Sequence, residues 1–192
     1  MSRILTSFFL RLLNWEASSA KNKPSEIIQR LQIQEGFKVA DIGSGGGFFT
    51  LEFARRAGEA GRVYAVDVRS EYLEFVKGQA EKQGLRNVAF VLARGSELDL
   101  PESSLDLAFL RNVFHHLPNP RTYFGNLKRF LKPKGIVAII DHKKKMGFSF
   151  VALLKHYTPN EFIVTEMEAA GYSLVESFDF LSEQTFNVFG LK

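Results

Sequence analysis

The sequence predicts an α/β protein built on a doubly wound, mostly parallel seven-stranded sheet, with an antiparallel last strand and helices on both faces. Three observations support this fold class. Strand-like and helix-like patterns alternate between residues 24 and 170. A glycine cluster, Gly43 to Gly47, follows the first strand pattern. Two strand patterns close the chain with only a short turn between them.

The first 22 residues are expected to form a helical segment ahead of one domain, residues 23–192, because 192 residues fit a single core. The stretch Ile4 to Trp15 is rich in Phe and Leu, and Arg11 interrupts its apolar run. Three interpretations stay open: a signal peptide, a basic amphipathic helix in peripheral contact with a membrane surface, and a helix that packs on the domain or covers its ligand. The last is favoured. No run is long enough to span a bilayer, so stable membrane insertion is not expected.

The first half of the domain alternates between helix and strand. Pro24 opens a helix, because proline is tolerated in a first helical turn. The next expected elements are a strand at Lys38–Ile42, a helix at Phe48–Ala57, a strand at Arg62–Val68, a helix at Glu71–Gln83 and a strand at Val88–Leu92. Gly84 is the stop signal of the second of these helices.

The second half continues the alternation. Its expected elements are a strand at Leu105–Leu110, a helix at Arg121–Leu131, a turn at Lys132–Gly135, a strand at Gly135–Asp141 and a helix at Pro159–Ala170. The strands Tyr172–Phe180 and Thr185–Leu191 then follow, and their short connection requires an antiparallel hairpin. Ligands of such sheets bind at the carboxyl ends of the strands.

Composition narrows the function classes. The net charge of +4 is only mildly basic and does not argue for nucleic acid as a partner. The chain has no cysteine, which excludes disulfides, thiolate nucleophiles and cysteine-ligated metals. A cytoplasmic location is compatible with this and is expected.

The glycine cluster suits two classes of ligand. A dinucleotide loop has the pattern G-x-G-x-x-G, and Gly43 and Gly45 fit it, but the third position is Phe48. Asp41 stands two residues before the first glycine, where it is a poor neighbour for a pyrophosphate. A carboxylate at that place favours a ligand with a positive charge.

A second acid, Asp67, ends the second expected strand, 24 residues after Gly43. That spacing places a carboxylate where it can accept hydrogen bonds from both hydroxyls of a ribose. Asp67 fits NAD or another adenosine cofactor, and Asp41 favours a cationic one.

These residues resemble class I S-adenosylmethionine-dependent methyltransferases, whose cofactor-binding half is similar to Val39 to Ala57 with Val63 to Val68. The resemblance continues through Leu98 to Ala108, which is similar to the family's L-P-x-x-x-x-S-F-D stretch. Asn112 to Leu117 is similar to its H-H-L ending, and Leu131 to Ile136 to its L-K-P-G-G turn. The resemblance covers residues 23–191 and implies a Rossmann-like sheet. The pattern from Tyr157 to Tyr172 looks most like the small-molecule branch, including relatives of arsenite methyltransferases, whose cysteines this chain lacks.

The resemblance implies roles for individual residues. The loop residues Gly43, Ser44, Gly45 and Gly47 bring backbone against the methionine part of the cofactor, with Asp41 near its ammonium group. Asp67 binds the ribose, and Val68 packs on the adenine. Asn112 lies near the methionine carboxylate and the transferred methyl.

One position departs from the family pattern. Members often carry an acid followed by alanine after the third strand, where the acid meets the adenine amino group. Arg94 and Gly95 stand there in this chain, and arginine cannot accept that hydrogen bond. The Gly95 backbone, with Ser96 or Glu97, is then expected to serve.

Catalysis needs no single strong motif, because methyl transfer from a sulfonium is an in-line displacement in which positioning contributes most. A base is needed only where the acceptor carries a proton. Candidates cluster after the fourth and fifth strands: His115, His116, Asp141 and His142. No metal site is expected, because no helical H-x-x-x-H spacing occurs.

The sequence therefore predicts an S-adenosylmethionine-dependent methyltransferase that acts on a small molecule, with no nucleic-acid partner. Two alternatives from other classes stay open. One is an NAD-dependent oxidoreductase, which Phe48 and Asp41 disfavour. The other is a non-catalytic module that keeps the fold and the cofactor, for which Arg94 leaves room.

Overall fold

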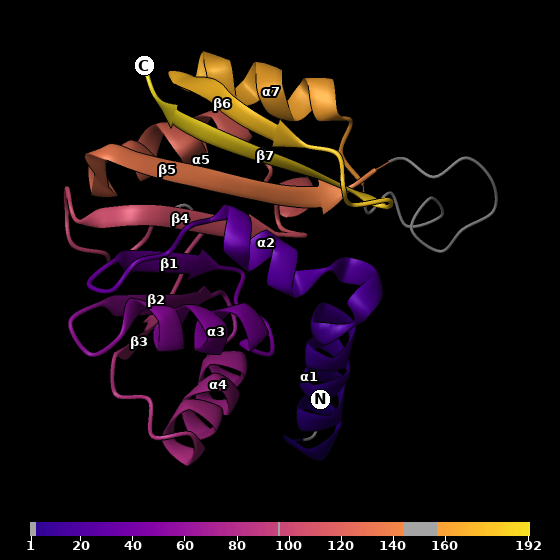
Figure 1. The fold of residues 1–192 in the computed structure, drawn as a ribbon, viewed down its shortest axis with the longest axis vertical. Coiled ribbons are helices and arrows are strands. Elements are labelled where there is room, and N and C mark those ends of the chain that lie inside the picture. The colour runs from indigo at the N-terminus through magenta and orange to yellow at the C-terminus, as the bar shows by residue number, and fades with distance from the viewer. Residues whose placement is uncertain (1–2, 96, 144–156) are drawn as a thin grey trace. The chain divides into compact units, whose positions relative to one another are not determined.

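Seven strands form one mixed sheet in the computed structural model, in the order β3-β2-β1-β4-β5-β7-β6, with helices on its flanks (Figure 1). The last strand of the chain is antiparallel to both of its neighbours, and the β1–β2, β2–β3 and β4–β5 pairs are parallel. This confirms the predicted fold class. The structure describes residues 3–95, 97–143 and 157–192. The chain divides into two units, residues 1–101 and 102–192, which are described separately.

The first unit contains three parallel strands, β1 (Lys38–Ile42), β2 (Arg62–Asp67) and β3 (Val88–Leu92). Helices α3 (Phe48–Ala57) and α4 (Ser70–Lys82) connect them in turn. Both connections step in the same direction along the sheet, so right-handed crossovers place both helices on one face. The residues of β1 after Lys38 are all buried.

The N-terminal segment of this unit is helical. It comprises α1 (Arg3–Ser18), the short 3-10 helix η1 (Ala20–Asn22) and α2 (Pro24–Arg30). Helix α1 packs against α3 and α4 and buries Leu10 completely. These contacts are of the kind expected from the favoured interpretation, a helix that packs on the domain or covers its ligand.

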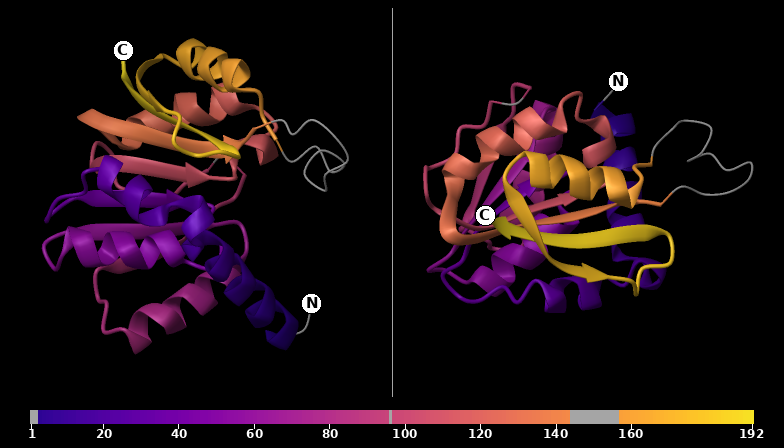
Figure 2. Two further views of the ribbon diagram at one scale, coloured as in Figure 1. Left: turned by 45° about the vertical axis from the view of Figure 1, so that its right-hand side comes forward. Right: turned by 90° about the horizontal axis from the view of Figure 1, so that it is seen from above.

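The second unit contains four strands, β4 (Leu105–Arg111), β5 (Leu131–His142), β6 (Tyr172–Phe178) and β7 (Gln184–Leu191). Its helices are η2 (Phe114–His116), α5 (Pro120–Leu127), η3 (Lys128–Phe130) and α7 (Asn160–Ala169). Helix α7 packs against α5 and against β6, beside the β6–β7 hairpin (Figure 2). Strand β7 pairs with β5 from Gly190 opposite Ile136 to Gln184 opposite His142.

Two predicted boundaries in this unit are wrong. The expected helix to Leu131 ends as α-helix at Leu127, and its last turn is the 3-10 helix η3. The expected turn at Lys132–Gly135 lies inside β5 as an irregularity, because Leu105 pairs with Leu131 while Leu107 pairs with Ile136. A proline that cannot donate to a neighbouring strand is accommodated where the ladder is interrupted.

Candidate functional site

The loop after β1 has the backbone geometry that only glycine adopts easily. Gly43, Gly45 and Gly47 have φ angles of +74°, +52° and +82°. A Cβ added at Gly47 meets Val76 side-chain carbon at 2.7 Å, so any other residue would also clash with α4. The loop therefore exposes main chain at the carboxyl end of β1 and leads directly into α3, whose first N–H groups have no partner within the helix.

Helix α1 lies directly against this loop. A Cβ at Gly46 meets Asn14 Oδ1 at 2.2 Å and the Leu10 carbonyl oxygen at 2.5 Å. Asn14 Nδ2 donates to the Gly46 carbonyl oxygen at 2.7 Å, and Asn14 Oδ1 accepts from the Phe48 N–H at 3.2 Å. Asn14 thus satisfies the first N–H of α3 from another helix. The sequence analysis missed Asn14, because nothing in its local sequence indicates a partner more than thirty residues away.

Asp41, at the end of β1, is buried beneath the loop. Its side-chain oxygen Oδ2 accepts from Thr50 Oγ1 at 2.5 Å, and the residue is only 4% exposed. Burial raises the pKa of Asp41 to about 7, against the lowering effect of the Thr50 hydrogen bond and with a smaller raising effect from the charge of Asp67. A buried acid of this kind gains from a cation placed beside it. Thr50 is a second residue that the sequence analysis missed.

Asp67, at the end of β2, is hydrogen-bonded to two backbone groups. Its oxygens accept from the Gly45 N–H at 3.0 Å and from the Arg69 N–H at 3.1 Å. Burial raises the pKa of Asp67, and these backbone donors oppose the rise. Asp67 therefore joins the glycine loop to the second strand, and the two sequence motifs lie together.

Two apolar side chains are exposed beside Asp67. Val68 follows β2 and is 66% exposed, and Leu92, opposite Asp67 in the β2–β3 register, is 43% exposed. Leu92 was not expected from the sequence. Together they provide an apolar surface at the same sheet edge as the carboxylate, which is the pairing that a nucleoside requires.

The loop also holds a buried hydroxyl. Ser44 is 8% exposed, and no hydrogen-bond partner is found for its Oγ among the described residues. An unsatisfied buried hydroxyl costs about 1–3 kcal/mol, which a polar ligand would recover. Ser44 therefore fits a loop that holds a polar cofactor.

The segment after β3 forms a tight turn. The Arg94 N–H donates to the Glu97 carbonyl oxygen at 3.2 Å, and the Glu97 N–H donates to the Arg94 carbonyl oxygen at 3.1 Å. Gly95, in the turn, has a φ of +64° and is exposed. Ser96 lies outside the described residues.

In the second unit, four donors converge on the fully buried carboxylate of Asp141. The His115 backbone N–H donates to Oδ2 at 3.0 Å, and His115 Nδ1 lies 2.7 Å from Oδ1. The His142 N–H donates to Oδ1 at 2.8 Å, and Thr158 Oγ1 donates to Oδ2 at 3.3 Å. A carboxylate accepts, so His115 Nδ1 is the donor of this contact.

The four predicted catalytic residues differ in how each of them relates to the Asp141 carboxylate. Side-chain contact joins His115 and Asp141, while His142 contributes its backbone N–H to the same carboxylate. His116 is exposed, and its ring centroid lies 4.1 Å from that of His115. Thr158 was not expected from the sequence.

Asn112, just past β4, has a strained backbone. Its φ of +57° is unusual for a residue other than glycine, and such strain concentrates at functional positions. Asn112 Oδ1 accepts from Gln184 Nε2 at 2.6 Å, and the Asn112 N–H donates to the Ile140 carbonyl oxygen at 2.8 Å. With Oδ1 bonded to Gln184, the Asn112 amide offers Nδ2 as a donor. Gln184 comes from β7 and was not expected.

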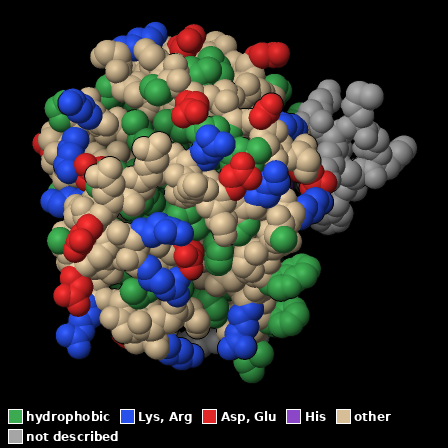
Figure 3. Space-filling view, in the orientation of Figure 1, with side chains coloured by type: hydrophobic (Ala, Val, Ile, Leu, Met, Phe, Trp, Pro, Cys, Tyr) green, Lys and Arg blue, Asp and Glu red, His purple; other side chains and the backbone are tan. Residues whose placement is uncertain are grey.

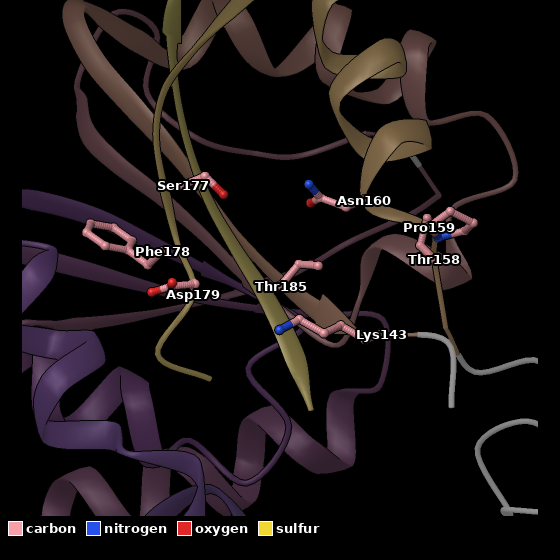
Figure 4. Close-up of a pocket in the computed structure, with 8 residues that line it drawn as sticks. All are labelled: Lys143, Thr158, Pro159, Asn160, Ser177, Phe178, Asp179 and Thr185. Atoms are coloured by element: carbon pink, nitrogen blue, oxygen red, sulfur yellow. The ribbon is translucent and has the colours of Figure 1, made fainter. Parts of the chain in front are cut away.

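A cavity of about 350 Å³ lies within the second unit (Figure 4). Its lining residues are Lys143, Thr158, Pro159, Asn160, Ser177, Phe178, Asp179 and Thr185. Ser177 and Asn160 lie on opposite sides of it, and both bond to the Asn187 side chain, at 2.8 Å and 2.6 Å. Thr158 belongs both to this cavity and to the group of donors around Asp141.

No group of three or more His, Asp or Glu residues that could hold a metal ion occurs among residues 3–95, 97–143 and 157–192. In the same residues, no helix is long and apolar enough to cross a membrane.

The sheet order with an antiparallel last strand is that of the S-adenosylmethionine-dependent methyltransferase fold. Residues 33–177 match the family described as "Methyltransferase domain". The chain belongs to this family, whose members use S-adenosylmethionine.

Known proteins agree with this assignment. The chain is 25% identical over 149 residues, 78% of its length, to demethylmenaquinone methyltransferase of Geobacillus stearothermophilus. It is 26% identical over 152 residues, 79% of its length, to the ubiquinone/menaquinone biosynthesis C-methyltransferase UbiE of Idiomarina loihiensis. The chain spans 60% of the length of each of these two proteins. A solved methyltransferase of Aquifex aeolicus has the same fold, with a TM-score of 0.86, 24% identity and coverage of 95% of this chain and 97% of that one.

Proposed function

We propose that this protein transfers the methyl group of S-adenosylmethionine to a small-molecule acceptor in the cytoplasm, without a nucleic-acid partner. The family assignment supports the donor. The names of the two curated relatives suggest a quinone as the acceptor class. We take the acceptor to be the reduced, hydroxyl-bearing form of a quinone, because its ring carbon becomes nucleophilic when the hydroxyl loses its proton.

The proposal assigns the cofactor to residues at the strand ends of the first unit. Asp67 accepts from the ribose hydroxyls, and Val68 and Leu92 contact the adenine, which the Gly95 backbone also approaches. Asp41 stabilises the ammonium group. The bare backbone of Gly43, Gly45 and Gly47 contacts the methionine portion, to which Ser44 donates its unsatisfied hydroxyl. Asn112, which belongs to the second unit, offers its Nδ2 as a donor.

When bound, S-adenosylmethionine supplies a methyl group activated by a sulfonium, so the protein's own task is positioning and proton removal. His115 Nε2 accepts the proton of the acceptor hydroxyl. Asp141 holds the ring through Nδ1 and stabilises the imidazolium that forms. Thr158 and the His142 N–H hold the Asp141 carboxylate in turn.

The observation that carries the catalytic part is the 2.7 Å contact between His115 Nδ1 and Asp141 Oδ1. A fully buried carboxylate that receives both the ring and the backbone of one histidine fixes that ring's orientation. We assign the base to His115 because this contact fixes its ring, whereas the contact of His142 with Asp141 is made through the backbone N–H.

Two assays test the proposal. Thermal unfolding is followed with S-adenosylmethionine, S-adenosylhomocysteine and NAD, where a ligand at 100 times its dissociation constant adds about 2.7 kcal/mol. Protein with methyl-labelled S-adenosylmethionine is then incubated with a reduced short-chain demethylmenaquinone and with metabolite extracts. We expect stabilisation by the first two ligands and label in the quinol. If NAD alone stabilises the protein, S-adenosylmethionine is not its cofactor. If label appears only in products of the metabolite extracts, a quinol is not its acceptor. If no product is labelled, the non-catalytic module is favoured.

A further inference from the structure

Helix α1 is apolar on two opposite sides. Its inner side packs on the first unit, where Thr6 and Ala17 are each 7% exposed and Leu10 is fully buried. Its outer side is equally apolar but faces solvent. We call the following six side chains the outer face of α1: Ile4, Leu5, Phe8, Phe9, Leu12 and Trp15. Figure 3 shows hydrophobic side chains protruding where α1 lies.

The outer face runs along the helix as an apolar stripe, with Glu16 between Leu5 and Phe9 near one margin. Its residues recur at helical spacing, and at 100° per residue they span an arc of about 140°. Ile4, Phe8 and Trp15, which lie in one half of this arc, are 81%, 69% and 70% exposed. Phe9 at its margin is 39% exposed and reaches Tyr72 of α4, with ring centroids 6.5 Å apart. Single exposed apolar residues are ordinary, but an exposed apolar stripe with three aromatic rings, Phe8, Phe9 and Trp15, indicates a binding surface.

Two basic side chains border one edge and one end of this stripe. Arg11 lies on the polar edge of the helix and is exposed, and Lys21 follows directly after α1 and is exposed as well. The first turn of α1 carries no acid. Glu16 is the acid of this helix, and its carboxylate accepts from Asn22 Nδ2 at 2.7 Å. An apolar stripe with aromatic rings and a basic edge complements an anionic lipid surface.

We infer that the outer face of α1 docks on a membrane surface that contains anionic lipid, with the helix lying in the plane of the interface. The helix has 16 residues, which is too short to span a bilayer. Phe8 and Leu12 enter the acyl region, and Trp15 lies at the headgroup level, where its ring and N–H are both accommodated. Arg11 stays with the headgroups. This docking surface is independent of the methyl acceptor and of the catalytic residues.

Trp15 makes the inference directly testable, because it is the only tryptophan of the chain. Full-length protein is titrated with vesicles of phosphatidylcholine containing 30% phosphatidylglycerol and with pure phosphatidylcholine vesicles. We expect a blue shift of the tryptophan emission with the first, at least tenfold weaker binding to the second, and quenching by brominated acyl chains. No emission shift and no co-sedimentation with either vesicle would overturn the inference.

Matched variants distinguish the contribution of the outer face to vesicle binding from that of charge. The double variant Phe8→Ala with Leu12→Ala keeps Trp15 as the fluorescent probe, and alanine is a good helix former. We expect this variant to bind vesicles at least tenfold more weakly. Phe162→Ala, on α7 and 47% exposed, is the control and should bind as the unmodified protein does. All variants should retain S-adenosylhomocysteine affinity. Unchanged binding of the double variant would mean attraction by charge alone, and a Trp15 shift that follows self-association without lipid would identify a second copy as the partner. Either result overturns the inference.

Discussion

The amide of Asn14 binds the main chain of Gly46, 32 residues away, and closes α1 over the glycine loop. The same amide accepts from the first N–H of α3. A Cβ at Gly46 would occupy the position of the Asn14 side chain, so the glycine and the asparagine require one another. Through this contact the N-terminal helix positions the loop that we assign to the cofactor.

Replacing Asn14 by alanine should therefore weaken cofactor binding. We expect S-adenosylhomocysteine affinity to fall about tenfold, because a lost helix cap costs about 0.5–2 kcal/mol and the loop loses a second hydrogen bond. Isothermal titration calorimetry measures it. Asn22→Ala is the control, since Asn22 donates to Glu16 rather than to the loop. Equal affinities of the two variants would contradict this role for Asn14.

Asp67→Ala should have a larger effect on the cofactor. The variant removes the proposed ribose acceptor and also frees the Gly45 and Arg69 N–H groups. Hydrogen bonds to a charged group contribute about 1.5–3 kcal/mol, so we expect S-adenosylhomocysteine affinity to fall roughly 10- to 100-fold. Asp99→Ala, an exposed acid, serves as the control. An unchanged affinity in the Asp67 variant would remove Asp67 from the site.

Cofactor affinity should depend on pH through Asp41, whose pKa burial raises to about 7. A cation is stabilised by the carboxylate and not by the protonated acid, so the affinity for S-adenosylhomocysteine should fall as pH drops below about 7. It should be roughly tenfold weaker at pH 6 than at pH 8. Asp41→Asn should bind weakly at both values. A flat profile in the unmodified protein would contradict the proposed ammonium contact.

Asp41 should also make the free energy of unfolding depend on pH. Its folded-state pKa lies above the unfolded value of 3.8, so between about pH 4 and pH 7 the folded state binds a proton that the unfolded state has lost. The free energy of unfolding should fall as pH rises through that window and level off above it. Asp41→Asn should be more stable near pH 8, by on the order of 4 kcal/mol, because the pKa shift of Asp41 is then removed and Asn can still accept from Thr50. Urea unfolding at several pH values measures this, and a less stable variant would contradict it.

His115→Gln should slow methyl transfer without affecting the cofactor. Loss of a general base costs roughly 10²- to 10⁴-fold in rate, measured as single-turnover label transfer to the quinol probe. Asp141→Asn should also slow transfer, because it removes the group that holds the His115 ring. His116→Gln, on an exposed neighbour, should retain most of the rate. Equal losses for His115→Gln and His116→Gln would contradict the assignment of His115.

Local sequence patterns were sufficient to predict many of the helices and strands. The bounds of β1, α3 and β3 follow directly from their residues, because a short apolar run between turn signals and a helical period leave few alternatives. The end of α5 could not be predicted, because Leu131 takes its strand conformation from pairing with Leu105 on β4. Asp41, the glycines and Asp67 were identified for the same local reason: a tight turn and a strand end require particular residue types.

What the sequence by itself determined was the fold class, the family and the residue types of the strand ends, since periodicity and glycine spacing are encoded within a few residues of each other. Only the tertiary structure decided which distant residues form hydrogen bonds with the groups at the strand ends. Asn14 reaches Gly46, Gln184 reaches Asn112, and Asp141 gathers His115 and Thr158. Each contact joins segments that are far apart in the chain, and a hydrogen bond between them exists only once packing has brought both groups within about 3 Å.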